Sequence, residues 1–207
     1  MNIVLFGDSI TDARRERDVG LHYSSFGMGY AFLLQSELAT KFPQKYNIYN
    51  RGISGNRIVD LYARIKTDCW NLNPDVLSIL VGANDVWHEL DSQNGVEIDR
   101  YEKVYRAIIE ETREKFPNVK IMLLEPFVLR GIATESRMEQ FCYIKEYAKV
   151  VKKIAKEYNL PFVALQEKLD EMAKKHGDEY VLGDGIHPTV VGAKIIADEW
   201  LKTFEKI

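Results

Sequence analysis

Short apolar runs alternate with longer segments of helical periodicity along the whole chain. The runs are rich in strand formers, and they predict strands at residues 2–6, 46–50, 75–81, 119–124 and 161–165. Between the runs, apolar residues recur three and four positions apart, which predicts helices. These helices fall within residues 30–42, 58–65, 101–116, 141–158 and 166–175, and a last helix carries Pro188 in its first turn.

Strands that alternate with helical segments are typical of a parallel sheet covered by helices on both faces. The sequence therefore predicts an α/β fold of the three-layer, flavodoxin-like type around a parallel five-stranded sheet. No internal repeat or linker interrupts the pattern, so we expect a single domain over residues 1–207.

The pattern also predicts which side chains face inward and which segment is irregular. The inward faces are expected to be Phe32, Leu33, Leu38 and Phe42 in the first helix and Ile58, Leu61, Tyr62 and Ile65 in the second. The segment from Ser9 to Gly29 is polar and contains several glycines, which predicts a loop that overlooks Ser9.

Composition narrows the function classes. The chain has 46% hydrophobic and 29% charged residues, the balance of an ordinary globular domain. The net charge is −3, without a long run of one sign, which argues against nucleic-acid or anionic-membrane partners. A strand that begins at residue 2 does not resemble a signal peptide, so we expect a cytoplasmic protein. Cys69 and Cys142 suit neither a disulfide framework nor a metal site, and both are expected to be buried.

Four polar motifs follow predicted strands or precede the last helix. They are Gly7-Asp8-Ser9-Ile10-Thr11, Gly52-Ile53-Ser54-Gly55, Gly82-Ala83-Asn84-Asp85 and Asp184-Gly185-Ile186-His187-Pro188. Ligands of open α/β sheets bind outside the carboxyl ends of the strands, so we expect these motifs to meet on one rim.

The residue types in these motifs suit nucleophilic catalysis. A serine hydroxyl needs a base within hydrogen-bond reach, and the base needs a third group that fixes its tautomer. Among the four histidines, only His187 lies in such a loop with an aspartate three residues before it. We therefore expect Ser9 to be the nucleophile, His187 the base and Asp184 the orienting acid. The N–H groups of Ser9 and Gly55 and the side-chain amide of Asn84 would form an oxyanion hole.

The four motifs, in this order, resemble the sequence blocks of the SGNH (GDSL) hydrolases. The resemblance covers nearly the whole chain. It implies a flavodoxin-like fold with strand order 2-1-3-4-5, and it implies the same roles for Ser9, His187, Asp184, Gly55 and Asn84.

Stretches between the blocks are similar to the intracellular acetylxylan esterases of this superfamily. They are Gly27-Met28-Gly29-Tyr30, Asn50 to Asn56, Pro74 to Ile79, Asn84 to Trp87 and Pro126-Phe127. This resemblance implies a small acylated carbohydrate substrate and a homo-oligomer. The leading hypothesis is a serine esterase, without cofactor or metal, that deacetylates xylo-oligosaccharides or other sugars.

Four residues near the blocks have a second interpretation. Trp87 could stack on a sugar ring or wall a small acyl pocket, although aromatic residues near strand ends often only pack. Arg57 could contact a polar substrate, although arginines at helix starts are commonly solvated. Asp8 and Asp85 are expected to bond local backbone rather than exchange protons.

Two other functions are considered. A lysophospholipase or thioesterase would use the same triad but needs an apolar slot for a long acyl chain, and the segment from Thr11 to Gly29 is polar. A non-catalytic sugar- or nucleotide-binding module could share the fold. Neither GxGxxG nor GxxxxGK[ST] occurs, which argues against a phosphate-cradling loop.

Overall fold

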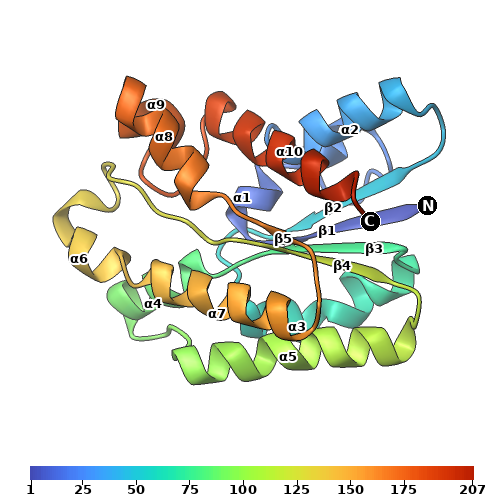
Figure 1. Cartoon of the computed structure of the whole chain (residues 1–207), viewed down its shortest axis with the longest axis horizontal. Coiled ribbons are helices and arrows are strands. Elements are labelled where there is room, and N and C mark those ends of the chain that lie inside the picture. Colours follow the sequence, from blue (N-terminus) through green and yellow to red (C-terminus); the bar gives the residue numbers. More distant parts are fainter.

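In the computed structural model, which describes residues 1–207, all five strands form one parallel sheet in the order β2-β1-β3-β4-β5 (Figure 1). The strands are β1 (Asn2–Gly7), β2 (Asn47–Gly52), β3 (Val76–Leu80), β4 (Lys120–Leu124) and β5 (Phe162–Val163). The predicted fold class and the strand order implied by the resemblance are thereby confirmed.

Helices cover both faces of the sheet and make the molecule three-layered (Figure 1). One face carries α2 (Tyr30–Lys41), α8 (Gln166–His176), α9 (Asp178–Val181) and α10 (Val190–Phe204). The other face carries α3 (Ile58–Asp68), α5 (Ile98–Lys115) and α7 (Ile144–Glu157). The remaining elements are α1 (Ser9–Asp12), η1 (Tyr23–Phe26), η2 (Trp70–Leu72), α4 (Ala83–Ser92), η3 (Glu135–Arg137) and α6 (Met138–Phe141).

The central strands are buried on both faces, which explains their continuous apolar sequence. Residues 3–6 of β1 have no exposed surface, and all of β3 is buried. The one polar side chain of β3, Ser78, accepts a hydrogen bond from Nε1 of Trp200 at 2.8 Å. That bond satisfies both buried polar groups and fixes α10 on the sheet.

Two predicted helix faces are partly wrong. In α2 the buried residues are Tyr30, Ala31, Leu34 and Leu38, whereas Phe32 is 45% exposed and Phe42 is 37% exposed. The orientation follows from Tyr30, whose hydroxyl hydrogen-bonds Thr11 Oγ1 at 2.9 Å inside the core. In α3, Tyr62 is 38% exposed, and its hydroxyl donates to Glu111 on the surface.

Other boundaries also differ from the sequence-based expectation. Pro188 precedes α10 and bridges to Leu182, and the helix is capped by Thr189, whose Oγ1 accepts the N–H groups of residues 191 and 192. β5 is shorter than predicted because Pro161 has no N–H to donate and Leu165 already turns into α8. The predicted loop after Ser9 contains α1 and η1, and α4 was not predicted. Cys69 is buried, but Cys142 is only half-buried.

None of the helices is both long enough and apolar enough to cross a membrane.

Candidate active site

Ser9 lies where β1 ends and α1 begins. Asp8 caps the helix through Oδ1, which accepts the Ile10 N–H at 2.9 Å. As the first residue of α1, Ser9 keeps its own N–H free of intrahelical bonds. The adjoining Gly52 allows this geometry, because a Cβ there would lie 2.1 Å from the Asp12 nitrogen. The serine is therefore presented at the carboxyl edge of the sheet, as predicted.

Ser9, His187 and Asp184 form a continuous hydrogen-bonded chain. The Ser9 Oγ lies 2.8 Å from His187 Nε2, and His187 Nδ1 lies 2.6 Å from Asp184 Oδ2. Asp184 Oδ1 accepts the backbone N–H groups of Ile186 and His187 at 2.9 and 2.7 Å. Because the ionised Asp184 accepts a hydrogen bond from the Nδ1–H, the Nε2 of a neutral ring is left unprotonated and can accept the serine proton.

The charges of the Ser9–His187–Asp184 hydrogen-bond chain suit proton transfer. Partial burial raises the pKa of Asp184, but the bonds from the His187 ring and from two backbone N–H groups lower it more, to about 2. Asp184 is therefore ionised at neutral pH. Its hydrogen bond raises the pKa of His187 above the ordinary value, against the opposing effect of burial. His187 can thus accept the Ser9 proton and hold it as an imidazolium.

The three donors predicted for an oxyanion hole are the Ser9 N–H, the Gly55 N–H and the side-chain amide of Asn84. Gly55 lies in a left-handed turn with φ of +82°, and its N–H forms no hydrogen bond within the protein. Asn84 is the second residue of α4, and one N–H of its side-chain amide donates to the Asn56 carbonyl at 3.1 Å. The amide has a second N–H to offer. Together with the Ser9 N–H, these groups can stabilise an oxyanion.

A loop that sequence reasoning missed supports the Asp184 segment. The Ala133 N–H donates to the Asp184 carbonyl at 3.0 Å, and the Leu129 N–H donates to the Gly185 carbonyl at 2.9 Å. A Cβ on Gly131 would lie 2.2 Å from the Asp184 carbonyl carbon. Only glycine allows the backbone to come this close to Asp184. A single glycine in the sequence does not predict such a contact.

Polar side chains that link the segments around the nucleophile were also missed. Asp12 Oδ2 accepts the Ser54 N–H and hydroxyl at 3.0 and 3.1 Å, which joins α1 to the Gly55 turn. Arg64 donates from Nη2 to the Gly7 carbonyl and from Nε to Asn56 Oδ1, at 2.9 and 2.6 Å. These contacts join segments that are far apart in the sequence, so local sequence patterns cannot predict them.

A cavity of about 450 Å³ opens beside Ser9 and His187. Its remaining walls come from both ends of the segment between α1 and α2, from the start of α2, from the turn after β2 and from the start of α10. Its lining is Ser9, Ile10, Ala13, Arg14, Met28, Gly29, Tyr30, Ser54, Asp184, His187, Pro188 and Ala193. Charged and hydroxyl groups are prominent among these residues, which suits a polar ligand with a small apolar group.

The two residues expected to contact substrate lie in different surroundings. The Trp87 ring lies 6.1 Å from the His187 ring and packs edge-on against Phe141, which supports a wall beside the base. Arg57 is bound elsewhere: Nε and Nη2 donate to Asp60, and Nη1 donates to Asn94. A substrate contact of Arg57 stays a prediction. The bonds to Asp60 and Asn94 do not favour it, because they already occupy the guanidinium group.

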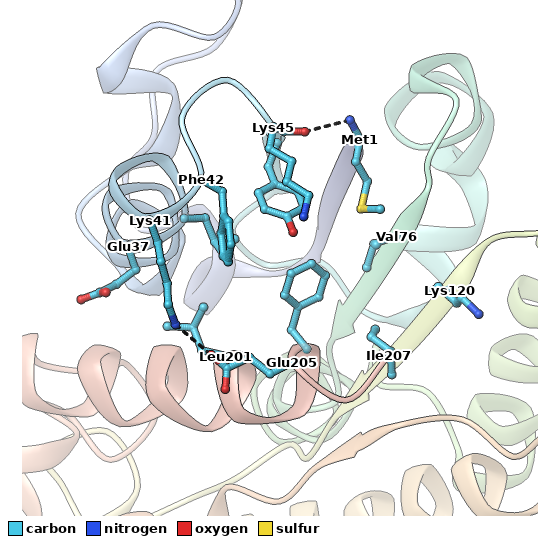
Figure 2. A pocket seen from close by; sticks show the side chains of 13 residues that line it. Met1, Glu37, Lys41, Phe42, Lys45, Val76, Lys120, Leu201, Glu205 and Ile207 are labelled. Atoms are coloured by element: carbon cyan, nitrogen blue, oxygen red, sulfur yellow. Dashed lines mark hydrogen bonds and ion pairs between the residues drawn. The ribbon is translucent and has the colours of Figure 1, made fainter.

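Another cavity, of about 380 Å³, lies at the opposite end of the sheet, between α2 and α10 (Figure 2). Phe42, Tyr46 and Phe204 contribute aromatic walls, and the pair of Lys41 with Glu205 closes one side at 3.1 Å. Its lining contains no serine or histidine. No group of three or more His, Cys, Asp or Glu side chains is arranged to hold a metal ion.

A sequence model of the GDSL-like lipase/acylhydrolase family matches residues 5–195. The chain belongs to this family. The GDSL-like chain is also 34% identical to the acetylxylan esterase of Geobacillus stearothermophilus, over 97% of this chain and 92% of that protein. The family and this relative identify the present protein as a carboxylic ester hydrolase, and they confirm the resemblance drawn from the four motifs.

Solved structures support the same family assignment. A protein of Parabacteroides merdae described as a GDSL-like lipase superposes with a TM-score of 0.93 at 37% identity, covering 99% of this chain and 95% of that one. Axe2, the Geobacillus stearothermophilus acetylxylan esterase, superposes with a TM-score of 0.86 at 33% identity, covering 98% and 93%. Structures of two catalytic mutants of Axe2 replace a serine and an aspartate with alanine.

Proposed function

We propose that this GDSL-like hydrolase is a serine esterase that removes acetyl groups from xylo-oligosaccharides or similar small sugars through Ser9, His187 and Asp184. The observation that carries the proposal is the unbroken chain from Asp184 through His187 to the Ser9 hydroxyl. No other side chain beside Ser9 offers this combination of base and orienting carboxylate.

In the first half of the reaction, Ser9 Oγ attacks the carbonyl carbon of the ester while His187 Nε2 takes the hydroxyl proton. The carbonyl oxygen becomes negative and is held by the N–H groups of Ser9 and Gly55 and by the Asn84 amide. The intermediate then collapses and breaks the bond to the sugar oxygen. His187 returns the proton to that oxygen, and the sugar leaves as an alcohol.

In the second half, a water molecule attacks the acetyl group on Ser9 and gives its proton to His187. The same three donors stabilise the second intermediate. Acetate leaves, and the proton returns to Ser9. The negative charge of Asp184 stabilises the imidazolium in both halves, because its pKa of about 2 keeps it ionised.

The carbohydrate substrate is supported by the relative and by the cavity. The Geobacillus stearothermophilus protein is an acetylxylan esterase. The cavity beside Ser9 is polar, bears Arg14 and Asp184, and has a volume of about 450 Å³. Such a site suits a hydroxylated sugar with a two-carbon acyl group better than a long acyl chain.

Matched esters test the substrate class. We expect acetyl esters of a chromophoric alcohol to be cleaved faster than butyryl esters, and butyryl faster than octanoyl. Acetylated xylo-oligosaccharides should release acetate with a higher kcat/KM than the chromophoric acetate. Faster octanoyl cleavage would favour the lysophospholipase or thioesterase alternative. Binding of the sugar without any hydrolysis would favour the non-catalytic module.

The homo-oligomer and the cytoplasmic location stay predictions from the sequence. Light scattering after size-exclusion chromatography tests the first, and cell fractionation tests the second.

A further inference from the structure

Asp85 connects the two segments that carry the oxyanion donors Asn84 and Gly55. It follows Asn84 in the first turn of α4, and it is only 1% exposed. Its Oδ1 accepts the N–H of Ile58, the first residue of α3, at 3.0 Å. The expected bond to local backbone is therefore wrong for Asp85, although it is right for Asp8. One carboxyl group joins two helices that begin at the active site.

The link made by Asp85 complements the bond that Asn84 makes itself. Asn84 reaches the Asn56 carbonyl through its side chain, which can still rotate about its own torsions. Asp85 instead holds the backbone at the start of α4 against the start of α3. Gly55 precedes that start by three residues, so this hydrogen bond lies between the segments that carry the two donors. Catalysis by oxyanion donors depends strongly on such positioning.

The surroundings of Asp85 favour its neutral form. Its Oδ2 is buried and has no hydrogen-bond partner, so a negative charge on this carboxyl would be poorly stabilised. Burial raises the pKa of Asp85 to about 8; the Ile58 bond opposes the rise, the Asp8 charge adds to it, and Arg57 opposes it weakly. At neutral pH the carboxyl is therefore mostly protonated.

Charged and titratable groups face Asp85 from every neighbouring element. Asp8 approaches from the end of β1, Arg57 from the start of α3, and Glu89 from the next turn of α4. The others are Tyr101 and Tyr105 of α5, Tyr147 of α7 and Glu97. The only cation in this set, Arg57, is already bound to Asp60. A proton lost from Asp85 would thus leave a buried charge without a partner of its own.

We propose that Asp85 is a positioning residue whose neutral carboxyl holds the Gly55 and Asn84 donors at their working distance, and that loss of its proton weakens the oxyanion hole. This inference rests on the oxyanion hole of the proposed function. Two effects follow from ionisation. A buried unpaired charge draws water into the contact between α3 and α4. A negative charge next to Asn84 also opposes the charge that develops on the substrate oxygen.

The test compares kcat of the wild type, Asp85→Asn and Asp85→Val for a chromophoric acetate from pH 6 to pH 9.5. In the wild type, kcat should fall about tenfold between pH 7 and pH 9, since about a tenth of the carboxyl stays neutral one unit above a pKa of about 8. Asp85→Asn keeps an acceptor for the Ile58 N–H and cannot ionise, so its kcat should not fall over that interval. Asp85→Val removes the acceptor, and its kcat at pH 7 should fall about tenfold with KM little changed.

Two controls separate the possible causes. Asp91→Asn removes an exposed carboxyl on the same helix, and its pH profile should match the wild type. Asp8→Asn removes a neighbouring carboxyl whose own pKa is raised by burial to about 7 and whose charge raises the pKa of Asp85, so the alkaline fall should move to lower pH. Circular dichroism at each pH checks folding. If Asp85→Val does not fold, the comparison of Asp85→Asn with the wild type decides alone.

An alkaline fall of the same size in Asp85→Asn and in the wild type would overturn the proposal. So would an unchanged kcat in a folded Asp85→Val. Failure of the underlying oxyanion hole is recognised separately, because Asn84→Ala would then retain the kcat of the wild type.

Discussion

Replacing Asp184 with asparagine should disable the base while leaving its loop in place. Asn keeps a carbonyl oxygen that can accept the two backbone N–H groups now bound by Asp184 Oδ1. At the other position an NH₂ group replaces Oδ2 and donates toward His187 Nδ1. The ring then carries its proton on Nε2, which points at Ser9 and can no longer accept the hydroxyl proton.

The size of the effect follows from this change of tautomer. Only the small fraction of rings in the reactive tautomer could act as a base, and the imidazolium would lose its carboxylate partner. Changes of this kind in serine hydrolases lower kcat by about 10⁴, or about 5 kcal/mol of activation free energy. The free energy of unfolding at neutral pH should change much less, because Asp184 is partly exposed and two of its three hydrogen bonds are retained.

Initial rates with a chromophoric acetate, measured with thermal unfolding of the same samples, check this prediction. Asp178→Asn is a matched control, because Asp178 also accepts a backbone N–H from the loop after β4, at 3.0 Å, but does not touch His187. Its kcat should stay near the wild-type value. A folded Asp184→Asn enzyme that keeps more than about a tenth of the wild-type kcat would refute the reasoning.

Three other predictions follow from the same geometry. Asn84→Ala should lower kcat by about 10²–10³ with little change in KM, and a change mainly in KM would instead make Asn84 a substrate-binding residue. In the wild type, kcat/KM should first rise with pH through an ionisation above the ordinary histidine value of about 6.5, since Asp184 raises the pKa of His187 and only the neutral ring accepts a proton; the fall assigned to Asp85 follows at higher pH. The absence of any rise between about pH 5 and 7 would contradict this base. Gly131→Ala should displace the Asp184 loop and lower both kcat and the melting temperature, as rates and calorimetry would show, and an unaltered kcat would mean that this contact does not position the triad.

The fold could be predicted where local sequence and burial agree. β1 and β3 are continuous apolar runs because both of their faces are covered, so their positions follow directly from the chain. The positions of Ser9 just after β1, Gly55 just after β2 and Asn84 just after β3 could be predicted for a similar reason, since parallel strands present their carboxyl ends at one edge.

Other features depend on contacts that no local pattern records. The inward face of α2 is rotated from the predicted one because Tyr30 bonds Thr11 inside the core. Gly131 beside Asp184 and Asp85 beside Ile58 are long-range contacts of residues with ordinary neighbours in sequence. Sequence reasoning therefore predicted the three hydrogen-bonded side chains Ser9, His187 and Asp184 but missed much of the framework that positions them.

The central claim is that Ser9 is the nucleophile of an ester hydrolase, and covalent labelling tests it most directly. The enzyme would be treated with a diethyl phosphate ester that carries a chromophoric leaving group, digested, and mapped by mass spectrometry. The account predicts one phosphoryl group, on Ser9, acquired as activity is lost, and no labelling of Ser9→Ala, which should also lack activity while remaining folded. A label on another residue, or a Ser9→Ala enzyme that still hydrolyses acetyl esters at a rate near the wild type, would contradict it.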